Sequence, residues 1–405
     1  MKKTLAFILA LVLFGAAYIS SVLAVEEVDV RDKILITSTA LEALGKIADP
    51  KAEQVFLQGL VSEHDLIKNS ALFALGNLKD KKFSSSLKDM LADKDPSLKI
   101  SALTALIKLG FPPAEKELLA LLESPDPWVR SEAVGLLEYY NQKYLPLALE
   151  LLKKEKDDDV CLAIIDLFAE TKFSQANEYI TRLLKSKNPK IRQASCRAIA
   201  KINAKGAVAS LKNKLKDDSV QVRIAAKESL GFLGDRSNIK LFWKEAYDEE
   251  PLVRLSSYSA LVYLRELDIL PVILEVISSV DTESYERRQA ALILARLNPE
   301  FTDFAGGAVK NNKLLEENMC LEYKINNKNL AVFLNSALKD KHSPLYEDAP
   351  FIISAFKEEA CLPALRESLS DEDTDMVANC IFALGEMEDR GSVDSLIGLC
   401  KKYGF

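Results

Sequence analysis

Apolar side chains recur along this chain with a period of 31 residues. Stepping from Thr37 by this period gives a series of positions that each follow an apolar residue: Ile36, Ile67, Leu98, Val129, Val160, Ile191, Val222 and Val253. Seven residues after each step lie Leu44, Leu75, Leu106, Leu137, Phe168, Ile199, Leu230 and Leu261. These units follow one another without insertion or deletion, which predicts a repeat protein.

Each unit is expected to form two helices. Counted from the Thr37 series, the columns at −1, +3, +7 and +10 have the spacing of one buried helical stripe, here called helix B. Turns with an acid or amide followed by proline precede several of these stripes, as in Asp95-Pro96, Asp126-Pro127, Asn188-Pro189 and Glu250-Pro251, and are typical helix starts. An apolar run such as Leu118–Leu122 precedes them and predicts a helix A. Since such short hairpins bury their apolar stripes only by stacking, the fold class predicted is all-α, an α-α superhelix (solenoid) of about 10–11 hairpins.

The segment Asp218–Asp235 resembles a HEAT repeat of the short PBS-lyase HEAT-like type, within the armadillo-like helical superfamily. The same signature occurs at Asp126–Arg130 and at Asn188–Arg192, and the resemblance extends over roughly Asp32 to Leu297. It implies a solenoid whose B helices line the concave side. Such arrays serve many unrelated roles, so the resemblance does not specify an activity.

The repeats divide the chain into a regular array at 25–299, a degenerate segment at 300–350 and a C-terminal part at 351–405. A ninth unit fits at Arg287, Ala290 and Leu294 after a two-residue insertion. We interpret 300–350 as eroded repeats, and a binding embellishment is the alternative. Repeat character returns at Asp373–Gly385, and the final helix, Ser392–Tyr403, is expected to cap the stack.

Residues 1–24 have the pattern of a secretory signal peptide. Lys2 and Lys3 precede an uncharged apolar run, and Val22-Leu23-Ala24 places small residues at a processing site. This predicts an exported protein, periplasmic or secreted, with no stable membrane insertion after cleavage. The alternative is an uncleaved anchor, because the apolar run approaches the minimum spanning length.

The composition argues for a folded protein that does not bind nucleic acid. Hydrophobic residues make up 48% and charged residues 28% of the chain, which is ordinary for a globular protein. The formal net charge is −7, whereas sequence-independent nucleic-acid binding needs a basic surface. Nucleic acid is therefore not expected as a partner.

Residues that carry chemistry are sparse. The only histidines are His64 and His342, and no close cysteine pair accompanies them, so neither a catalytic nor a metal site is predicted. Asp371, Asp373 and Asp375 resemble the start of a calcium loop but lack its later glycine and glutamate, so we interpret them as helix-capping acids. No cofactor is expected, and the chain is not expected to be an enzyme.

Six cysteines leave the disulfide state open. An exported protein can form disulfides, and Cys361, Cys380 and Cys400 fall in successive C-terminal helices. The alternative is small buried thiols, because Cys196 and Cys380 lie at or beside the buried stripe.

A basic column also has two interpretations. Lys68, Lys99, Arg130, Arg192, Arg223 and Arg254 share one position of the repeat. They could form a strip for an anionic ligand. We favour a hydrogen-bond ladder between repeats, as the family resemblance also implies, because arginine presents a fork of donors suited to such ladders.

The open face of helix B supplies the candidate binding site. The columns at +2, +5 and +9 are predicted to point away from the buried stripe. Candidate residues at +5 and +9 are Phe73, Tyr139, Arg197, Lys201, Glu228, Phe232 and Tyr263. Because aromatic and arginine side chains are favoured interface anchors, we expect this groove to hold an extended or helical segment of another exported protein. The alternatives are ordinary scattered exposed aromatics, an accessory or lyase-type protein acting on a chromophore or protein substrate, and a structural cell-envelope component.

Overall fold

The computed structural model describes residues 30–279, 281–295, 327–343 and 345–404. The predicted signal peptide and most of the 300–350 segment therefore lie outside the described residues. Within them every regular element is helical, as the repeat pattern predicts.

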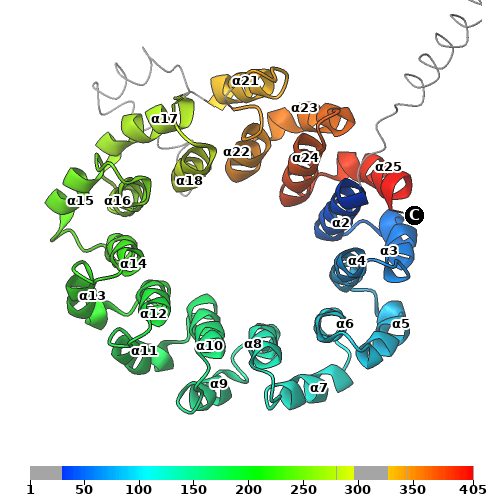
Figure 1. Cartoon of the computed structure of the whole chain (residues 1–405), viewed down its shortest axis with the longest axis horizontal. Coiled ribbons are helices and arrows are strands. Elements are labelled where there is room, and N and C mark those ends of the chain that lie inside the picture. Colours follow the sequence, from blue (N-terminus) through cyan, green and yellow to red (C-terminus); the bar gives the residue numbers. More distant parts are fainter. Residues whose placement is uncertain (1–29, 280, 296–326, 344, 405) are drawn as a thin grey trace, which may run out of the picture.

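The helices form two concentric layers of a ring (Figure 1). The inner layer holds the B helices: α2 (Val30–Ile47), α4 (Asp65–Leu78), α6 (Pro96–Lys108), α8 (Pro127–Gly135), α10 (Asp158–Glu170), α12 (Pro189–Lys201), α14 (Val220–Phe232), α16 (Pro251–Tyr263), α18 (Ser284–Ala295), α22 (Ala349–Phe356) and α24 (Thr374–Glu386). The outer layer holds the A helices: α3 (Glu53–Leu60), α5 (Ser84–Asp89), α7 (Pro113–Leu121), α9 (Leu145–Leu152), α11 (Asn177–Leu183), α13 (Val208–Lys214), α15 (Ile239–Glu245), α17 (Leu270–Ser278), α21 (Asn327–Ala337), α23 (Leu362–Glu367) and α25 (Val393–Tyr403). Short 3-10 segments join many of them, such as Pro50–Ala52 before α3 and Leu136–Tyr140 after α8. The B helices thus form the concave layer, as expected.

The turn residues start the inner helices in the predicted way. Asp95, Asp126 and Asn188 are N-caps whose side chains accept a hydrogen bond from the backbone N–H two residues further on. Each is followed by proline at the first helical position, where no N–H is needed. Asp373 caps α24 in the same way, which confirms the capping interpretation of this acid. Such a cap stabilises a helix by about 1 kcal/mol.

The buried stripe of helix B forms the continuous core between the layers. Ile67, Leu137 and Leu230 are each at most 1% exposed. In the ninth unit Ala290 and Leu294 are buried as well, as the two-residue insertion predicts. Each fully buried aliphatic side chain contributes roughly 1.5–3 kcal/mol, so the stability of each hairpin depends on its neighbours.

Glycine at the +8 column brings successive inner helices into close contact. A Cβ atom added at Gly45 would stand 2.7 Å from the Cα atom of Ala74 in the next repeat. At Gly231 the same addition would meet the Cα atom of Ala260 at 2.6 Å. At these joints only glycine permits this approach, so it sets the distance between the two inner helices there.

The two ends of the chain close the ring. Helix α2 packs against both α24 and α25, side by side in Figure 1. A Cβ atom added at Gly385 would stand 2.8 Å from the Cα atom of Ala43, in the register in which Gly45 meets Ala74. Lys46 forms an ion pair with Glu386, and both residues occupy the +9 column, as do Lys201 and Glu170 in their own ion pair. The joint between the ends therefore repeats the joint between neighbours.

The closing hairpin is built from both termini. Each inner helix follows its outer partner in the chain, but α2 begins the described array and its outer partner is α25, the last helix. The sequence predicted that this final helix caps the stack. In the structure α25 packs on α2 and completes a repeat, because the rotation between hairpins brings the last unit back to the first.

A buried ion-pair cluster joins α18 to α22. Asp348, which is 1% exposed, accepts hydrogen bonds from Arg287 Nε at 2.9 Å, Arg288 Nε at 2.6 Å and Ser284 Oγ at 2.5 Å. The two helices also pack directly. This cluster fixes the ring where the regular 31-residue register is interrupted.

Across the part of the chain that the structure describes, no helix combines the length and apolar character needed to cross a bilayer.

Candidate binding face on the inner helices

Five of the seven candidate residues surround one hollow of about 210 Å³ on the inner layer. Arg197 and Lys201 come from α12, Glu228 and Phe232 from α14, and Tyr263 from α16. The structure thus brings together residues that lie up to two repeats apart in the chain. The small side chains Ala200, Ser229 and Ser259 also line the hollow and leave room between the larger ones.

The aromatic wall of this hollow follows from the 31-residue spacing. Phe232 and Tyr263 both occupy the +9 column, so neighbouring B helices place them side by side. Their ring centroids lie 5.2 Å apart with an interplanar angle of 79°, an edge-to-face contact that contributes about 0.5–1.5 kcal/mol. Phe232 is 47% exposed, so much of its ring remains open to a ligand.

Charged side chains of both signs border the aromatic wall. Lys201 forms an ion pair with Glu170, and Asp166 lies close to Lys201 and Arg197. Burial raises the pKa of Asp166, and Lys201 and Arg197 lower it in opposition. The mixture suits a peptide with polar side chains better than a purely apolar ligand.

The other two candidates belong to a second cluster. Phe73 on α4 and Tyr139 after α8 both contact Lys108, whose Nζ atom lies 4.7 Å and 5.7 Å from their ring centroids. The Lys108 ammonium also donates a hydrogen bond to Asn77 Oδ1 at 2.9 Å. Burial lowers the pKa of Lys108, while the nearby Glu138 raises it. Two cation–π contacts therefore organise this cluster.

Two residues of the inner layer were missed by sequence reasoning. Lys108 occupies the +9 column, as Lys201 does, and this position could have identified it. Phe382 occupies the +5 column of the last repeat, is 39% exposed and lies under the Lys46 ammonium at 5.2 Å. A third aromatic–cation contact thus spans the closing joint.

The +2 column faces outward at Glu132, but several of its other members are buried, contrary to the prediction. Ser70, Ala225 and Ser256 are each at most 2% exposed, and Ala194 is 9% exposed. Neighbouring inner helices pack so closely that this column lies between them, and small side chains fill it. At these repeats only the +5 and +9 columns of the prediction remain as binding positions.

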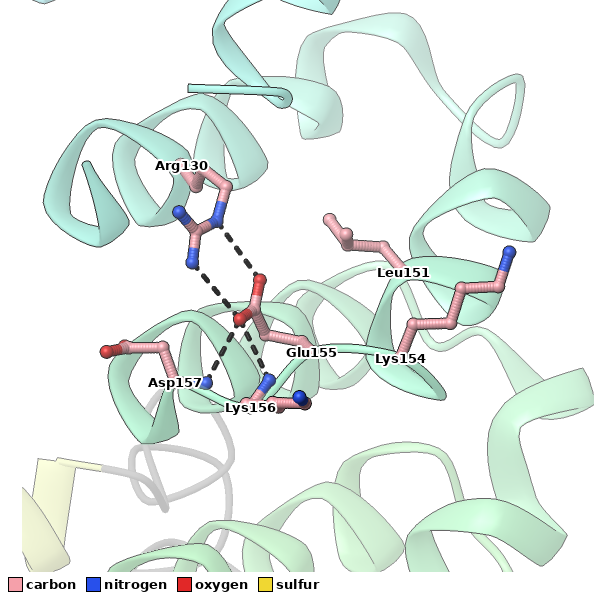
Figure 2. Close-up of a pocket in the computed structure, with 6 residues that line it drawn as sticks. All are labelled: Arg130, Leu151, Lys154, Glu155, Lys156 and Asp157. Carbon is pink, nitrogen blue, oxygen red and sulfur yellow. Dashed lines mark hydrogen bonds and ion pairs between the residues drawn. The ribbon is translucent and has the colours of Figure 1, made fainter. Parts of the chain in front are cut away.

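The basic column forms the predicted ladder at several repeats. Figure 2 shows Arg130 from α8 reaching the carboxylate of Glu155, with Nε and Nη2 each 3.1 Å from a carboxylate oxygen. Its Nη1 atom donates to the carbonyl of Ser124 at 2.8 Å. Burial raises the pKa of Glu155, but bonds from Arg130 and from two backbone amides lower it to a greater extent. One arginine therefore fastens its own turn and the turn of the next repeat.

Arg192 and Arg254 repeat this arrangement. The Arg192 Nε and Nη2 atoms donate to Asp217 at 3.0 Å and 2.7 Å. Those of Arg254 donate to Glu286 at 3.0 Å and 2.6 Å. In both, Nη1 donates to carbonyl oxygens of the preceding turn. The side chains at these positions thus serve stability rather than an exposed anion-binding strip.

The Arg192–Asp217 pair predicts a specific pH dependence of stability. Burial raises the pKa of Asp217, but hydrogen bonds from Arg192 and Lys214 hold it well below its usual range. A depressed folded-state pKa stabilises the protein above the unfolded value of about 3.9. This contribution begins to decline near that value and is lost completely only as the pH falls through the lower folded-state pKa. We expect Asp217→Asn to destabilise the protein at pH 7. The difference between variant and wild type in the free energy of unfolding should shrink by about 1 kcal/mol between pH 5 and pH 3. Urea unfolding of both proteins at each pH measures this difference in the free energy of unfolding. A difference that stays constant with pH would contradict the assignment.

The described cysteines are free thiols. Cys196, Cys361, Cys380 and Cys400 are buried, and Cys161 is half-buried. Burial raises the pKa of Cys196 and of Cys380 to about 12. They pack as small apolar side chains, the second of the two interpretations drawn from the sequence.

Among the described residues, no three histidine, cysteine, aspartate or glutamate side chains gather where they could hold a metal ion. His64 is the N-cap residue of α4, although its side chain makes no capping hydrogen bond.

A stacked array of helical hairpins with arginine–carboxylate bonds between repeats defines an α-solenoid. Consistent with this, the family model for HEAT repeats matches residues 31–106, 84–166 and 145–231. Over residues 31–231 the chain is thus built of HEAT repeats.

The comparison with solved structures finds similar chains at low identity. YibA of Escherichia coli is 18% identical, with 71% of this chain and 97% of that chain covered and a TM-score of 0.39. A chain from the complex of CpcE and CpcF of phycocyanin lyase from Nostoc sp. PCC7120 is 19% identical, with 63% and 91% covered and a TM-score of 0.33. A chain from the complex of Kap95p with RanGDP is 16% identical, with 88% and 61% covered and a TM-score of 0.40. No curated protein matches the chain.

Proposed function

We propose that this protein is an exported scaffold that binds a segment of another protein on the inner helices of the ring, without catalysis. The observation that carries the proposal is the hollow formed by Arg197, Lys201, Glu228, Phe232 and Tyr263. Aromatic and arginine side chains at the centre of a concave surface are the residues that contribute most to protein–protein binding. The inner layer provides them on successive helices held at fixed spacing.

The arrangement also supports the kind of ligand proposed. Repeats set the Phe232 and Tyr263 rings side by side, and further aromatic–cation contacts lie at Lys108 and Lys46. A peptide segment that follows the inner helices would meet one such contact after another. Binding then depends on several small anchors rather than on one deep pocket.

Replacing Phe232 and Tyr263 with serine is expected to weaken partner binding strongly while the helical fold is retained. Each aromatic anchor of an interface contributes on the order of 2 kcal/mol, so the double variant should bind at least a hundredfold more weakly. A photo-crosslinking amino acid at Arg197 would first identify the partner in the native host. Titration of that partner against both proteins then measures the loss.

Tyr247→Ser is the matched control, because Tyr247 is 66% exposed and follows the outer helix α15. This variant should bind the partner as wild type does. Equal binding by the double variant and wild type, with circular dichroism unchanged, would refute the inner-face proposal.

Export rests on the apolar segment and the small residues at 22–24. We expect the mature protein from the native host to begin at Val25. N-terminal sequencing after cell fractionation tests this. A protein that retains Met1 in the membrane fraction would support the anchored alternative, and one that retains it outside the membrane would exclude export.

A further inference from the structure

One member of the basic column differs from the others. Arg223 anchors itself like its relatives, with Nη1 donating to the carbonyl oxygens of Asp217 at 2.8 Å and Asp218 at 3.1 Å. In Arg130, Arg192 and Arg254, the opposite edge of the guanidinium, formed by Nε and Nη2, grips a carboxylate. Among the described residues, no carboxylate occupies this edge of Arg223.

Arg223 lines a hollow of about 360 Å³. Its walls come from the first turns of α14 and α16, from α15 and from the turn before α16. They include the apolar side chains of Val220, Ile224 and Val253. In the hollow beside Arg130, the chain's own Glu155 fills the arginine fork (Figure 2). The hollow at Arg223 therefore has the donors of a carboxylate site without a carboxylate of the chain bound to them.

The sequence explains why this fork is open. Glu155 and Asp217 each lie 25 residues after the arginine they bind, and the corresponding residue for Arg223 is Asp248. Lys214 helps to hold Asp217 inward by an ion pair at 3.0 Å. One repeat later this lysine position is Glu245, which repels the carboxylate of Asp248 instead of attracting it. Asp248 is exposed and accepts a bond from the Glu250 amide.

A second difference between this repeat and the preceding ones makes the hollow polar. Lys227 occupies the +4 column, where the preceding repeats have apolar residues such as Leu103 and Cys196, and it is 4% exposed. It pairs with Glu245 at 2.5 Å and donates to Ser257 Oγ at 2.9 Å. Burial lowers the pKa of Lys227, and Glu245 raises it in opposition. Glu245 is thereby held by Lys227 and does not compete for Arg223.

From these contacts we infer that Arg223 and the adjoining hollow form a binding site for a carboxylate group of a ligand. The guanidinium would take the carboxylate through Nε and Nη2, as Arg130 takes Glu155, and the apolar wall would cover the neighbouring methylene groups. Asp248 and Glu250 at the edge favour a ligand with a positive charge beside its carboxylate and disfavour polyanions. A glutamate followed by lysine in a peptide and the free amino acid glutamate both have this chemistry. The site is separate from the inner-face hollow and does not depend on the proposed scaffold function.

Titration of the full chain with acetyl-Ala-Glu-Lys-Ala-amide tests the site. The backbone amide resonances of Val220, Ile224 and Val253 are expected to shift and saturate, whereas the peptide with glutamine in place of glutamate should leave them unchanged. A parallel titration with sodium glutamate distinguishes the two sources of the carboxylate: the tighter ligand of the two names the source. Absence of a saturable shift with both carboxylates would overturn the inference.

Two variants distinguish bidentate binding by the Arg223 guanidinium from attraction by its positive charge alone. Arg223→Lys retains the positive charge but loses the bidentate geometry, so binding should weaken about tenfold. Asp248→Asn keeps the fork and removes only a negative charge that attracts the lysine of the peptide, so it should weaken binding less than Arg223→Lys does. Melting curves establish that each variant is folded. Unchanged affinity in Arg223→Lys, or a loss in Asp248→Asn as large as in Arg223→Lys, would show that the carboxylate is not held by Arg223.

Discussion

Replacing Gly385 with leucine is expected to open the ring while leaving the individual repeats folded. A Cβ atom at this position would already stand 2.8 Å from both the Cα and the Cβ atom of Ala43, so a leucine side chain must push α24 away from α2. Overpacking of this kind costs about 1–3 kcal/mol, and here the cost falls on the joint between the two chain ends. Small-angle scattering should show a larger radius of gyration, and circular dichroism should show an unchanged helix content.

Gly135→Leu provides the control for this experiment. Gly135 ends the inner helix α8, and a Cβ atom added there meets no atom within 4 Å. The control should keep the dimensions of the wild-type protein. If Gly385→Leu also keeps them, the contact between α2 and α24 does not hold the ring closed.

Asp348→Asn is expected to destabilise the protein more than any substitution of an exposed charge. Asp348 is the carboxylate partner of Arg287, which is buried, and of Arg288. The substitution leaves a buried positive charge without its counter-ion, which typically costs about 3–5 kcal/mol. Because α18 and α22 meet at this cluster, thermal unfolding should begin at a lower temperature and lose part of the helical signal in an early step.

The exposed pair of Glu178 and Arg182 offers a comparison. Their side chains are 80% and 69% exposed, and such pairs contribute less than about 1 kcal/mol. Glu178→Gln should therefore melt close to wild type. A melting temperature of Asp348→Asn equally close to wild type would mean that the buried cluster contributes little to the joint.

The sequence predicts the hairpins of this fold well because the signal is local. The apolar −1 and +7 columns, the capping acids at Asp95 and Asp126 and the prolines after them each depend on neighbours within one or two turns. Closure of the ring depends instead on the small rotation between successive hairpins, summed over the whole array. No single repeat encodes that sum, and so α25 was interpreted as a cap.

The candidate site was also predicted only in part, because the sequence pattern specifies local features better than contacts between helices. The +5 and +9 columns identified the residues of the inner layer, and the exact period placed Phe232 beside Tyr263. The +2 column was assigned wrongly at several repeats because its exposure depends on how closely two inner helices approach, which the spacing within one helix does not determine. The open fork of Arg223 was hidden in the sequence as well, since it follows from the exchange of Lys214 for Glu245 one repeat later.

The composite hairpin of α2 and α25 has a consequence for how the chain folds. Lys46 and Glu386 meet across 340 residues, and α25 follows later still, so α2 gains its inner neighbour α24 and its outer partner α25 only after all the other described repeats have been synthesised. Until then its apolar stripe is covered on one side alone. A circular permutant that joins the two ends by a short linker and begins at another loop would convert this long-range contact into a local one, and is expected to fold faster to the same ring.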